Sequence, residues 1–304
     1  MTKGMIVPLE SARLVEFAHP ILCYICEGQN NVDAEYCRFC GAPLALAHQT
    51  GRQKAPPQMV ACVGASGVGK TVYLGTLMDM LSRESSHLQL LARGAFSITL
   101  QQTTLAALSR CEFPEKTPNE PDRWNWVHCR VRRPRQRQPL ELIMPDMAGE
   151  AILQEVDHPR SFRVISSFLK KCDGLMVLID VTKLTEGGQT QDFFTMKLIT
   201  YLAELDDGSK RGWTKRPLAL VFTKVDQCEE CAADPEDFAR KHATGLWQQC
   251  EDRFHRHKFF AAAVAGSCAN RQADGEARIH VPLRIEPHGI VEPFEWVLSH
   301  LNGY

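Results

Sequence analysis

Residues 64–71 read GASGVGKT, which matches the phosphate-binding pattern G-x-x-x-x-G-K-[ST] without a gap. The apolar run MVACVG ends at the loop and a helical pattern follows it, which is the context that the motif requires. The glycines let backbone N–H groups surround a phosphate, and a helix N-terminus favours its negative charge. We therefore expect phosphate contacts from six loop residues: Gly64, Ala65, Ser66, Gly67, Val68 and Gly69.

Lys70 and Thr71 complete this loop, and a second motif supplies a carboxylate. The Lys70 amine is expected to reach the β- and γ-phosphates, and the Thr71 hydroxyl is expected to bind Mg²⁺. The apolar run LIMPDMAGE places Asp146 after a strand candidate, where it can hold Mg²⁺ through water. Residues 146–149 also read D-x-x-G, so the amide of Gly149 is expected at the γ-phosphate.

A third motif is expected to recognise the base of the nucleotide. Thr223, Lys224 and Asp226 follow an apolar run and match [N/T]-K-x-D. The Asp226 carboxylate can accept hydrogen bonds from guanine N1–H and the 2-amino group, which adenine does not offer in that arrangement. The Lys224 stem can lie along the purine ring. The three motifs together favour GTP and GDP over ATP.

Four cysteines form a metal-binding pattern near the N-terminus. Cys23 and Cys26 form one C-x-x-C pair, and Cys37 and Cys40 form another. Two such pairs suit tetrahedral Zn²⁺, and four thiolates leave no open position, so the predicted zinc is structural. The segment lacks a dense Lys/Arg face, which favours protein docking or internal packing over nucleic acid.

A further C-x-x-C pair, Cys228 and Cys231, follows the base motif. With Cys250, His255 or His257 it could form a second metal site. A single pair is weak evidence, so ordinary loop and helix cysteines are the favoured interpretation.

The composition and net charge indicate a globular protein. The 304 residues carry a formal charge of −1, and 44% are hydrophobic, which supplies a core without a general attraction to nucleic acid or anionic membranes. The sequence shows neither a signal-peptide pattern nor an apolar run long enough to span a membrane. A reducing cytoplasm with a bound metal explains the 12 cysteines better than a disulfide framework.

The elements that position these motifs alternate between strand-like and helical patterns from residue 59 onward. This alternation predicts an α/β fold with a mainly parallel sheet covered by helices. The predicted strands are residues 59–64, 124–131, 140–146, 174–181, 218–224 and 259–266. The predicted helices are residues 71–82, 98–110, 159–172, 190–205, 235–253 and 291–301. We place a zinc ribbon at 1–46, a polar, proline-containing linker at 47–58, and the α/β domain at 59–304.

The phosphate loop, D-x-x-G and T-K-x-D in this order resemble a Ras-like GTPase domain of the translation-factor-related class. The resemblance covers residues 59 to about 302 and implies a P-loop NTPase three-layer sandwich with GTP-bound and GDP-bound switch states. The segments GVGKTVYLGTLMDML and GIVEPFEWVLSHL also resemble bacterial zinc-ribbon "double-GTPase" proteins associated with conflict or defence loci. This resemblance implies a cytoplasmic switch acting on a protein effector or answering to an activating partner.

Two positions of the GTPase pattern depart from the family. We choose Thr117, in the loop before a strand candidate, as the switch threonine for Mg²⁺ and the γ-phosphate, ahead of Thr103 and Thr104. Glu150 stands where Ras-like GTPases use Gln to orient water, so we expect slow hydrolysis, completed by a partner, dimerisation or an arginine such as Arg123. Alternatively, Glu150 simply caps a helix.

The guanine O6 contact in this family comes from a backbone amide in a turn after the last central strand. Here the run AVAGSCAN offers Ser267, Cys268 or Ala269 for that turn.

Two alternative functions remain open. One is a non-hydrolysing, nucleotide-bound scaffold. The other is a nucleic-acid-handling factor that uses the ribbon and the arginine-rich segment 130–137, which is otherwise a solvated hairpin tip.

Overall fold

The computed structural model describes residues 20–50, 57–83, 88–132, 139–185, 189–206, 213–272 and 278–301. The chain divides into two compact units, Met1–Pro56 and Pro57–Tyr304. Helix α2 (Ala45–Thr50) occupies the first part of the expected linker, so the N-terminal unit extends beyond residue 46. Residues 51–56 of that linker lie outside the described residues.

The N-terminal unit is built on two very short strands and a set of buried cysteines. Strands β1 (Ile21–Leu22) and β2 (Gln29–Asn30) pair antiparallel. Apart from the cysteines, the buried apolar side chains among its described residues are few: Tyr24, Ile25, Ala42, Leu44, Leu46 and Ala47. A unit with so small a core depends on additional cross-links for stability.

The larger unit is organised around one sheet in the order β10-β9-β8-β7-β3-β6-β5-β4. Its five central strands run parallel, and antiparallel pairs close both edges. The strands are β3 (Gln58–Gly64), β4 (Gln89–Ala92), β5 (Asn125–Arg132), β6 (Leu140–Asp146), β7 (Gly174–Asp180), β8 (Leu218–Thr223), β9 (His257–Gln272) and β10 (Arg278–His288). Parallel central strands place their carboxyl ends at one edge, where ligands bind in open α/β sheets.

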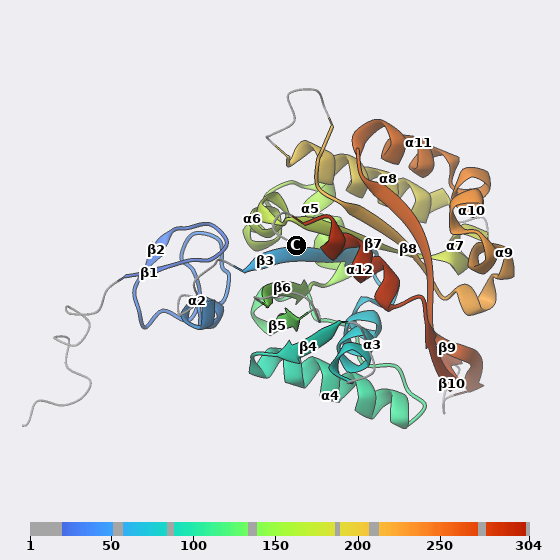
Figure 1. Cartoon of the computed structure of the whole chain (residues 1–304), viewed down its shortest axis with the longest axis horizontal. Helices are drawn as coiled ribbons and strands as arrows, with labels where there is room; N and C mark the ends of the chain where they lie inside the picture. The colour runs from blue at the N-terminus through green and yellow to red at the C-terminus, as the bar shows by residue number, and fades with distance from the viewer. Residues whose placement is uncertain are drawn as a thin grey trace, which may run out of the picture. The chain divides into compact units, whose positions relative to one another are not determined.

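Helices cover both faces of the sheet and complete a three-layer α/β sandwich (Figure 1). On one face, α3 (Lys70–Ser82), α4 (Ala95–Ser109) and α12 (Val291–Ser299) pack with the sheet in a single apolar cluster. On the other face, Phe168 packs edge-on against Trp126 of β5, and Phe238 packs against Phe222 of β8. The remaining helices are α5 (Gly149–Asp157), α6 (Arg163–Lys171), α7 (Val181–Thr185), α8 (Gln189–Glu204), α9 (Glu229–Ala233), α10 (Pro235–His242) and α11 (Thr244–Arg253), with 3₁₀ turns η1 (Pro121–Arg123) and η2 (Val225–Gln227).

Several expected elements differ from the structure at their boundaries. The helix expected at 235–253 is two helices, because Ala243 leaves the helical region at φ −138° and ψ 49°. The helix expected to begin at residue 159 begins at Arg163. Strands β4 and β10 were not predicted, and β9 is longer than residues 259–266.

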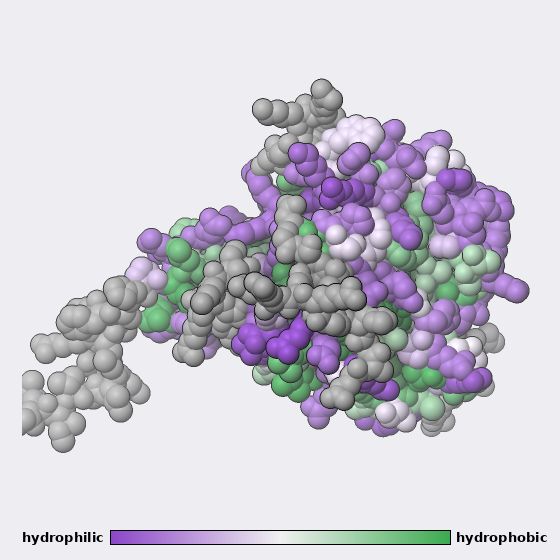
Figure 2. Space-filling view, viewed as in Figure 1, coloured by the Kyte–Doolittle hydropathy of each residue, from purple (hydrophilic) through white to green (hydrophobic). Residues whose placement is uncertain are grey.

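The described surface in Figure 2 is largely hydrophilic over α8, α10 and α11. Among the described helices, none combines the length and the apolar character that crossing a bilayer demands.

Candidate functional site

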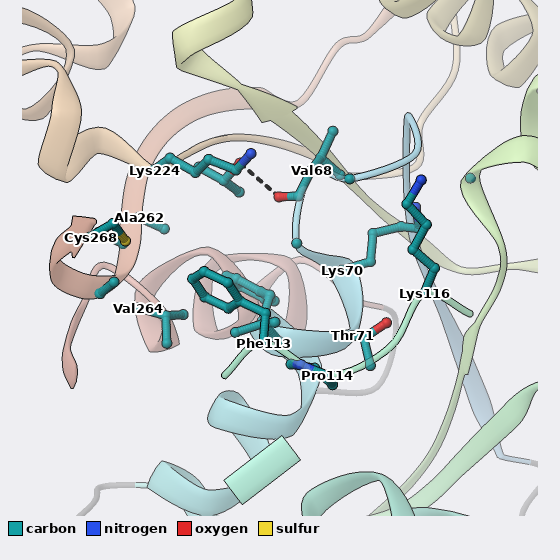
Figure 3. Close-up of a pocket in the computed structure, with 18 of the residues that line it drawn as sticks. Val68, Lys70, Thr71, Phe113, Pro114, Lys116, Lys224, Ala262, Val264 and Cys268 are labelled. Carbon is teal, nitrogen blue, oxygen red and sulfur yellow. Dashed lines mark hydrogen bonds between the residues drawn. The ribbon is translucent and has the colours of Figure 1, made fainter. Parts of the chain in front are cut away.

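A cavity of about 430 Å³ lies at the carboxyl edge of the parallel strands (Figure 3). This volume is within the range of small-molecule sites, about 300–1,000 Å³. Six segments that are distant in sequence line it: the phosphate loop with the start of α3, the loop after α4, Gly149 of α5, the T-K-x-D segment, strand β9 and Ile290 before α12. The cavity brings together many of the residues expected at a nucleotide: Ser66, Gly67, Val68, Gly69, Lys70, Thr71, Thr117, Gly149, Thr223, Lys224, Asp226 and Cys268.

The phosphate loop runs from the end of β3 to the start of α3. Gly69 has φ 92°, a left-handed conformation that glycine adopts without a Cβ penalty. The buried Lys70 amine donates to the backbone carbonyls of Gly64 and Ala65, both at 3.0 Å. Burial lowers the Lys70 pKa, and the nearby Asp146 carboxylate opposes that shift. The loop therefore holds the Lys70 amine at its centre.

Thr71, Thr117 and Asp146 converge beside this lysine. The hydroxyls of Thr71 and Thr117 are 3.0 Å apart, and both donate to Asp146 Oδ2, at 2.9 and 3.1 Å. Asp146 is 1% exposed, and its other carboxylate oxygen, Oδ1, is buried and has no hydrogen-bond partner among the described residues. Burial raises the Asp146 pKa, against the effects of Lys70 and the two hydroxyls. A hard cation with oxygen ligands such as Mg²⁺ fits this donor set and its unpaired buried oxygen.

The D-x-x-G segment passes directly against the phosphate loop. A Cβ on Gly149 would lie 2.4 Å from Ser66 N, so only glycine fits this approach without a shift of backbone. The next residue, Glu150, accepts hydrogen bonds at 3.2 Å from the Ser66 hydroxyl and the Asn119 amide. Its carboxylate therefore joins the phosphate loop to the loop that carries Thr117.

The T-K-x-D segment begins at the last residue of β8. The Thr223 hydroxyl is 2.9 Å from the Val68 carbonyl oxygen, an interaction drawn in Figure 3, and 3.2 Å from that of Ile179. Lys224 has φ 61° and donates to the buried carboxylate of Asp180. Asp226 lies in η2 and lines the cavity. The T-K-x-D segment and the phosphate loop are thus joined by a direct hydrogen bond between Thr223 and Val68.

The turn expected at residues 267–269 is wrong. Strand β9 continues to Gln272, because β10 pairs with it as the second arm of a hairpin. Cys268 lines the cavity from this strand, whereas Ser267 is exposed and does not line it. Burial raises the Cys268 pKa, assisted by Asp226. An O6 contact from this region would therefore come from a strand and not from a turn.

Part of the cavity wall was not expected from the sequence. Phe113 of the loop after α4, the β9 residues Ala262 and Val264, and Ile290 before α12 give the cavity an apolar side. Phe113 is the one aromatic residue in residues 111–123, which is the signal that could have pointed to it. Arg123, expected as an activating group, does not line the cavity: it lies in η1, is 66% exposed, and faces Glu120.

The four N-terminal cysteines form a compact cluster. Their Sγ atoms all lie within 4.8 Å of one another, with Cys23 and Cys40 at 3.7 Å and Cys26 and Cys37 at 3.5 Å. Zinc–sulfur bonds of about 2.3 Å in a tetrahedron require sulfur separations of about 3.8 Å, so the cluster fits that ion. Asn30 Nδ2 and Phe39 N donate toward the Cys37 sulfur, as outer-shell groups do around metal-bound thiolates.

The sequence has two further features: a candidate second metal site at Cys228 and Cys231, and the arginine-rich segment 130–137. Within the described ranges, no further group of three metal-binding side chains comes together, and Cys231 and Cys250 are buried. Of the arginine-rich segment, residues 133–137 lie outside the described residues. Arg130 bonds to the Glu141 carboxylate at 2.6 Å.

The chain is similar to solved structures that include a small COPII coat GTPase SAR1 from Encephalitozoon cuniculi, with 14% identity, a TM-score of 0.37, and 80% of this chain and 79% of that one covered. A putative nucleolar GTP-binding protein 1 from Plasmodium falciparum gives 12% identity, a TM-score of 0.41 and coverages of 80% and 86%. Roco2 from Methanosarcina barkeri gives 11% identity, a TM-score of 0.34 and coverages of 69% and 44%. At these TM-scores the resemblances are too loose to assign an activity.

No curated protein matches the chain in sequence. The model of the Double-GTPase 2 family matches residues 58–280, well over half of the 304 residues. This match spans the phosphate loop, D-x-x-G and T-K-x-D motifs that meet at the cavity. The chain belongs to the Double-GTPase 2 family and is a GTPase-type protein.

Proposed function

We propose that this protein binds GTP with Mg²⁺ in the cavity and slowly hydrolyses it to GDP and phosphate. The observation that carries the proposal is the meeting of Lys70, the Thr71–Thr117–Asp146 cluster and Asp226 in one place. The first two suit phosphate with a metal ion, and Asp226 suits guanine. Family membership supports the same assignment.

Catalysis would depend mainly on positioning and on charge neutralisation. The loop amides and Lys70 would hold the β- and γ-phosphates, while Thr71, Thr117 and Asp146 would hold Mg²⁺. When bound, Mg²⁺ neutralises charge that develops on the phosphate oxygens. Gly149 passes close enough to the loop for its amide to face the γ-phosphate, which is the role we assign to it.

Slow turnover follows from Glu150. Its carboxylate is held by Ser66 and Asn119, and a carboxylate near a γ-phosphate is repelled unless a cation or proton intervenes. A partner that displaces Glu150 would accelerate the reaction. This arrangement supports a regulatory switch that acts on a protein effector, and the resemblance to double-GTPase proteins suggests a bacterial conflict or defence system in the cytoplasm.

The cysteine cluster is proposed to hold one structural Zn²⁺. All four ligand positions are thiol groups, so no coordination site remains for a substrate.

A titration of the purified protein with GTP, GDP and ATP in the presence of Mg²⁺ tests nucleotide choice. We expect preference for GTP and GDP, and a preference for ATP would overturn the proposal. Phosphate release measured beside a Lys70→Ala control tests hydrolysis. If the parent binds GTP tightly but releases phosphate no faster than this control, a non-hydrolysing scaffold is favoured instead. The hydrogen-bonded carboxylate of Glu150 also suits that role.

A further inference from the structure

Three lysines line the cavity, and two of them are bound by the protein itself. Lys70 donates to two loop carbonyls, and Lys224 donates to Asp180. The third, Lys116, belongs to none of the sequence motifs. It is exposed and makes no hydrogen bond or ion pair with any described residue. Its ammonium is therefore free to bind a ligand.

The position of Lys116 places this charge near the phosphates. Its neighbour Thr117 has its hydroxyl 3.0 Å from that of Thr71, at the candidate Mg²⁺ site. Adjacent Cα atoms are about 3.8 Å apart, and the four-carbon stem of lysine is flexible. Lys116 and Lys70 both line the cavity, and both side chains are drawn and labelled in Figure 3.

We propose that Lys116 is a further catalytic residue, whose ammonium contacts the γ-phosphate and stabilises its charge during hydrolysis. The inference rests on the proposed GTPase function. In that reaction a water oxygen bonds to the γ-phosphorus, the bond to the β–γ bridging oxygen breaks, and GDP leaves with that electron pair. The water protons pass to phosphate and solvent. A cation at the γ-phosphate is the kind of group that raises the rate of such transfers.

Lys116 would supply the positive charge at the γ-phosphate that was expected from Arg123. Arg123 lies outside the cavity lining and faces Glu120, whereas Lys116 is on the same loop, one residue from Thr117. Glu115 also lines the cavity and carries the opposite charge. Lys116 must therefore act by direct contact, because the loop as a whole offers little net charge.

Binding gives the first test, with Lys116→Ala, Lys116→Arg and, as a matched control, Lys183→Ala, which removes an exposed lysine of α7 outside the cavity. Calorimetry compares GDP with the non-hydrolysable β,γ-imido analogue of GTP, each with Mg²⁺. We expect Lys116→Ala to weaken analogue binding about tenfold and to leave GDP binding unchanged, as loss of a charged hydrogen bond would. Lys116→Arg should retain much of the affinity. An equal loss for both nucleotides, or no loss, would overturn the γ-phosphate contact.

Single-turnover hydrolysis gives the second test. We expect the rate to fall about 100-fold in Lys116→Ala, to recover partly in Lys116→Arg and to stay at the parent value in Lys183→Ala. An unchanged rate in Lys116→Ala would overturn the catalytic role. If the parent binds GTP without hydrolysing it, the proposed function fails and the catalytic role with it, while the affinity ratio still decides the γ-phosphate contact.

Discussion

The hydroxyl of Thr223 donates a hydrogen bond to the backbone carbonyl of Val68, 155 residues earlier in the chain. The bond joins the last residue of β8 to the middle of the phosphate loop, and both residues line the cavity. Thr223 is 7% exposed, so water does not replace this contact. The T-K-x-D segment and the G-x-x-x-x-G-K-T loop are thus fixed relative to each other by the protein itself.

We predict that Thr223→Val loosens this connection. The substitution keeps the shape of the side chain but leaves the Val68 carbonyl without its donor, which lowers the free energy of unfolding by about 1–3 kcal/mol. GTP and GDP affinities should fall together, because both nucleotides use the loop and the base site. Urea unfolding and calorimetry measure the two effects. Thr223→Ser keeps the hydroxyl and should behave as the parent; if it does not, the hydrogen bond is not the cause.

Most of this site could be predicted from the sequence, because its motifs are short continuous segments that lie at strand ends. Each of β3, β6 and β8 is a nearly continuous apolar run that ends in a motif. The structure confirms the mainly parallel sheet and brings Thr117 to Thr71 and Asp146, the contact that its choice as a switch threonine requires. Helix α3 begins at Lys70, one residue before its predicted start.

The missed parts depend on pairing between distant segments. Strand β10 contains Pro282 and Pro287, residues that argue against a strand, and it forms only as the edge partner of β9. That pairing also extends β9 through Ser267, which is why the expected turn is absent. Likewise, the contacts of Glu150 with Ser66 and Asn119 join the start of α5 to two loops that no local pattern connects with it.

We predict that Glu150→Gln hydrolyses GTP faster than the parent. Glutamine keeps the size of the side chain and an acceptor for Ser66, while it removes the negative charge beside the γ-phosphate position. Single-turnover phosphate release should rise severalfold, with about tenfold corresponding to 1.4 kcal/mol of barrier. A rate no higher than that of the parent would contradict the charge argument.

Asn119→Ala separates charge from tethering in the same site. It removes one hydrogen-bond donor to Glu150 but keeps the carboxylate charge. We therefore expect little acceleration from this variant. Equal acceleration in Asn119→Ala and Glu150→Gln would show that the tether, and not the charge, limits the parent.

Asp226 is expected to decide between guanine and adenine. Replacement by alanine removes the carboxylate that would pair with N1–H and the 2-amino group, so GTP affinity should fall about 10- to 100-fold, as for loss of a charged hydrogen bond. ATP affinity should change little, because adenine never used those bonds. Competition between the two nucleotides measures the ratio. Loss of both affinities in equal measure would assign Asp226 to structure instead of base choice.

The buried His128 should make the protein sensitive to acid. Burial lowers the His128 pKa below its ordinary 6.5, although Glu141 at 3.0 Å opposes the shift. Below pH 6.5 the unfolded chain takes up a proton that the folded protein does not yet bind. The free energy of unfolding should therefore fall as the pH drops from 6.5 toward the lower folded pKa, by at most about 1.4 kcal/mol per pH unit.

Urea unfolding at a series of pH values between 7.5 and 5.5 measures this slope. His128→Gln should flatten it, whereas His158→Gln, which changes an exposed histidine, should keep the slope of the parent. An unchanged slope in His128→Gln would assign the acid sensitivity to other groups.

The cysteine cluster predicts one zinc ion per chain and a specific dependence of stability on it. Cys37→Ser should lose the ion and unfold the N-terminal unit, because that unit has few buried apolar side chains and metal binding supplies its folding energy. Cys231→Ser should retain one zinc, since Cys231 lies outside the cluster. Zinc content and GTP affinity are measured for each variant. Because the α/β unit has its own sheet and core, GTP binding should survive Cys37→Ser. Retention of zinc in Cys37→Ser, or loss of a second equivalent in Cys231→Ser, would contradict the assignment of a single Cys₄ site.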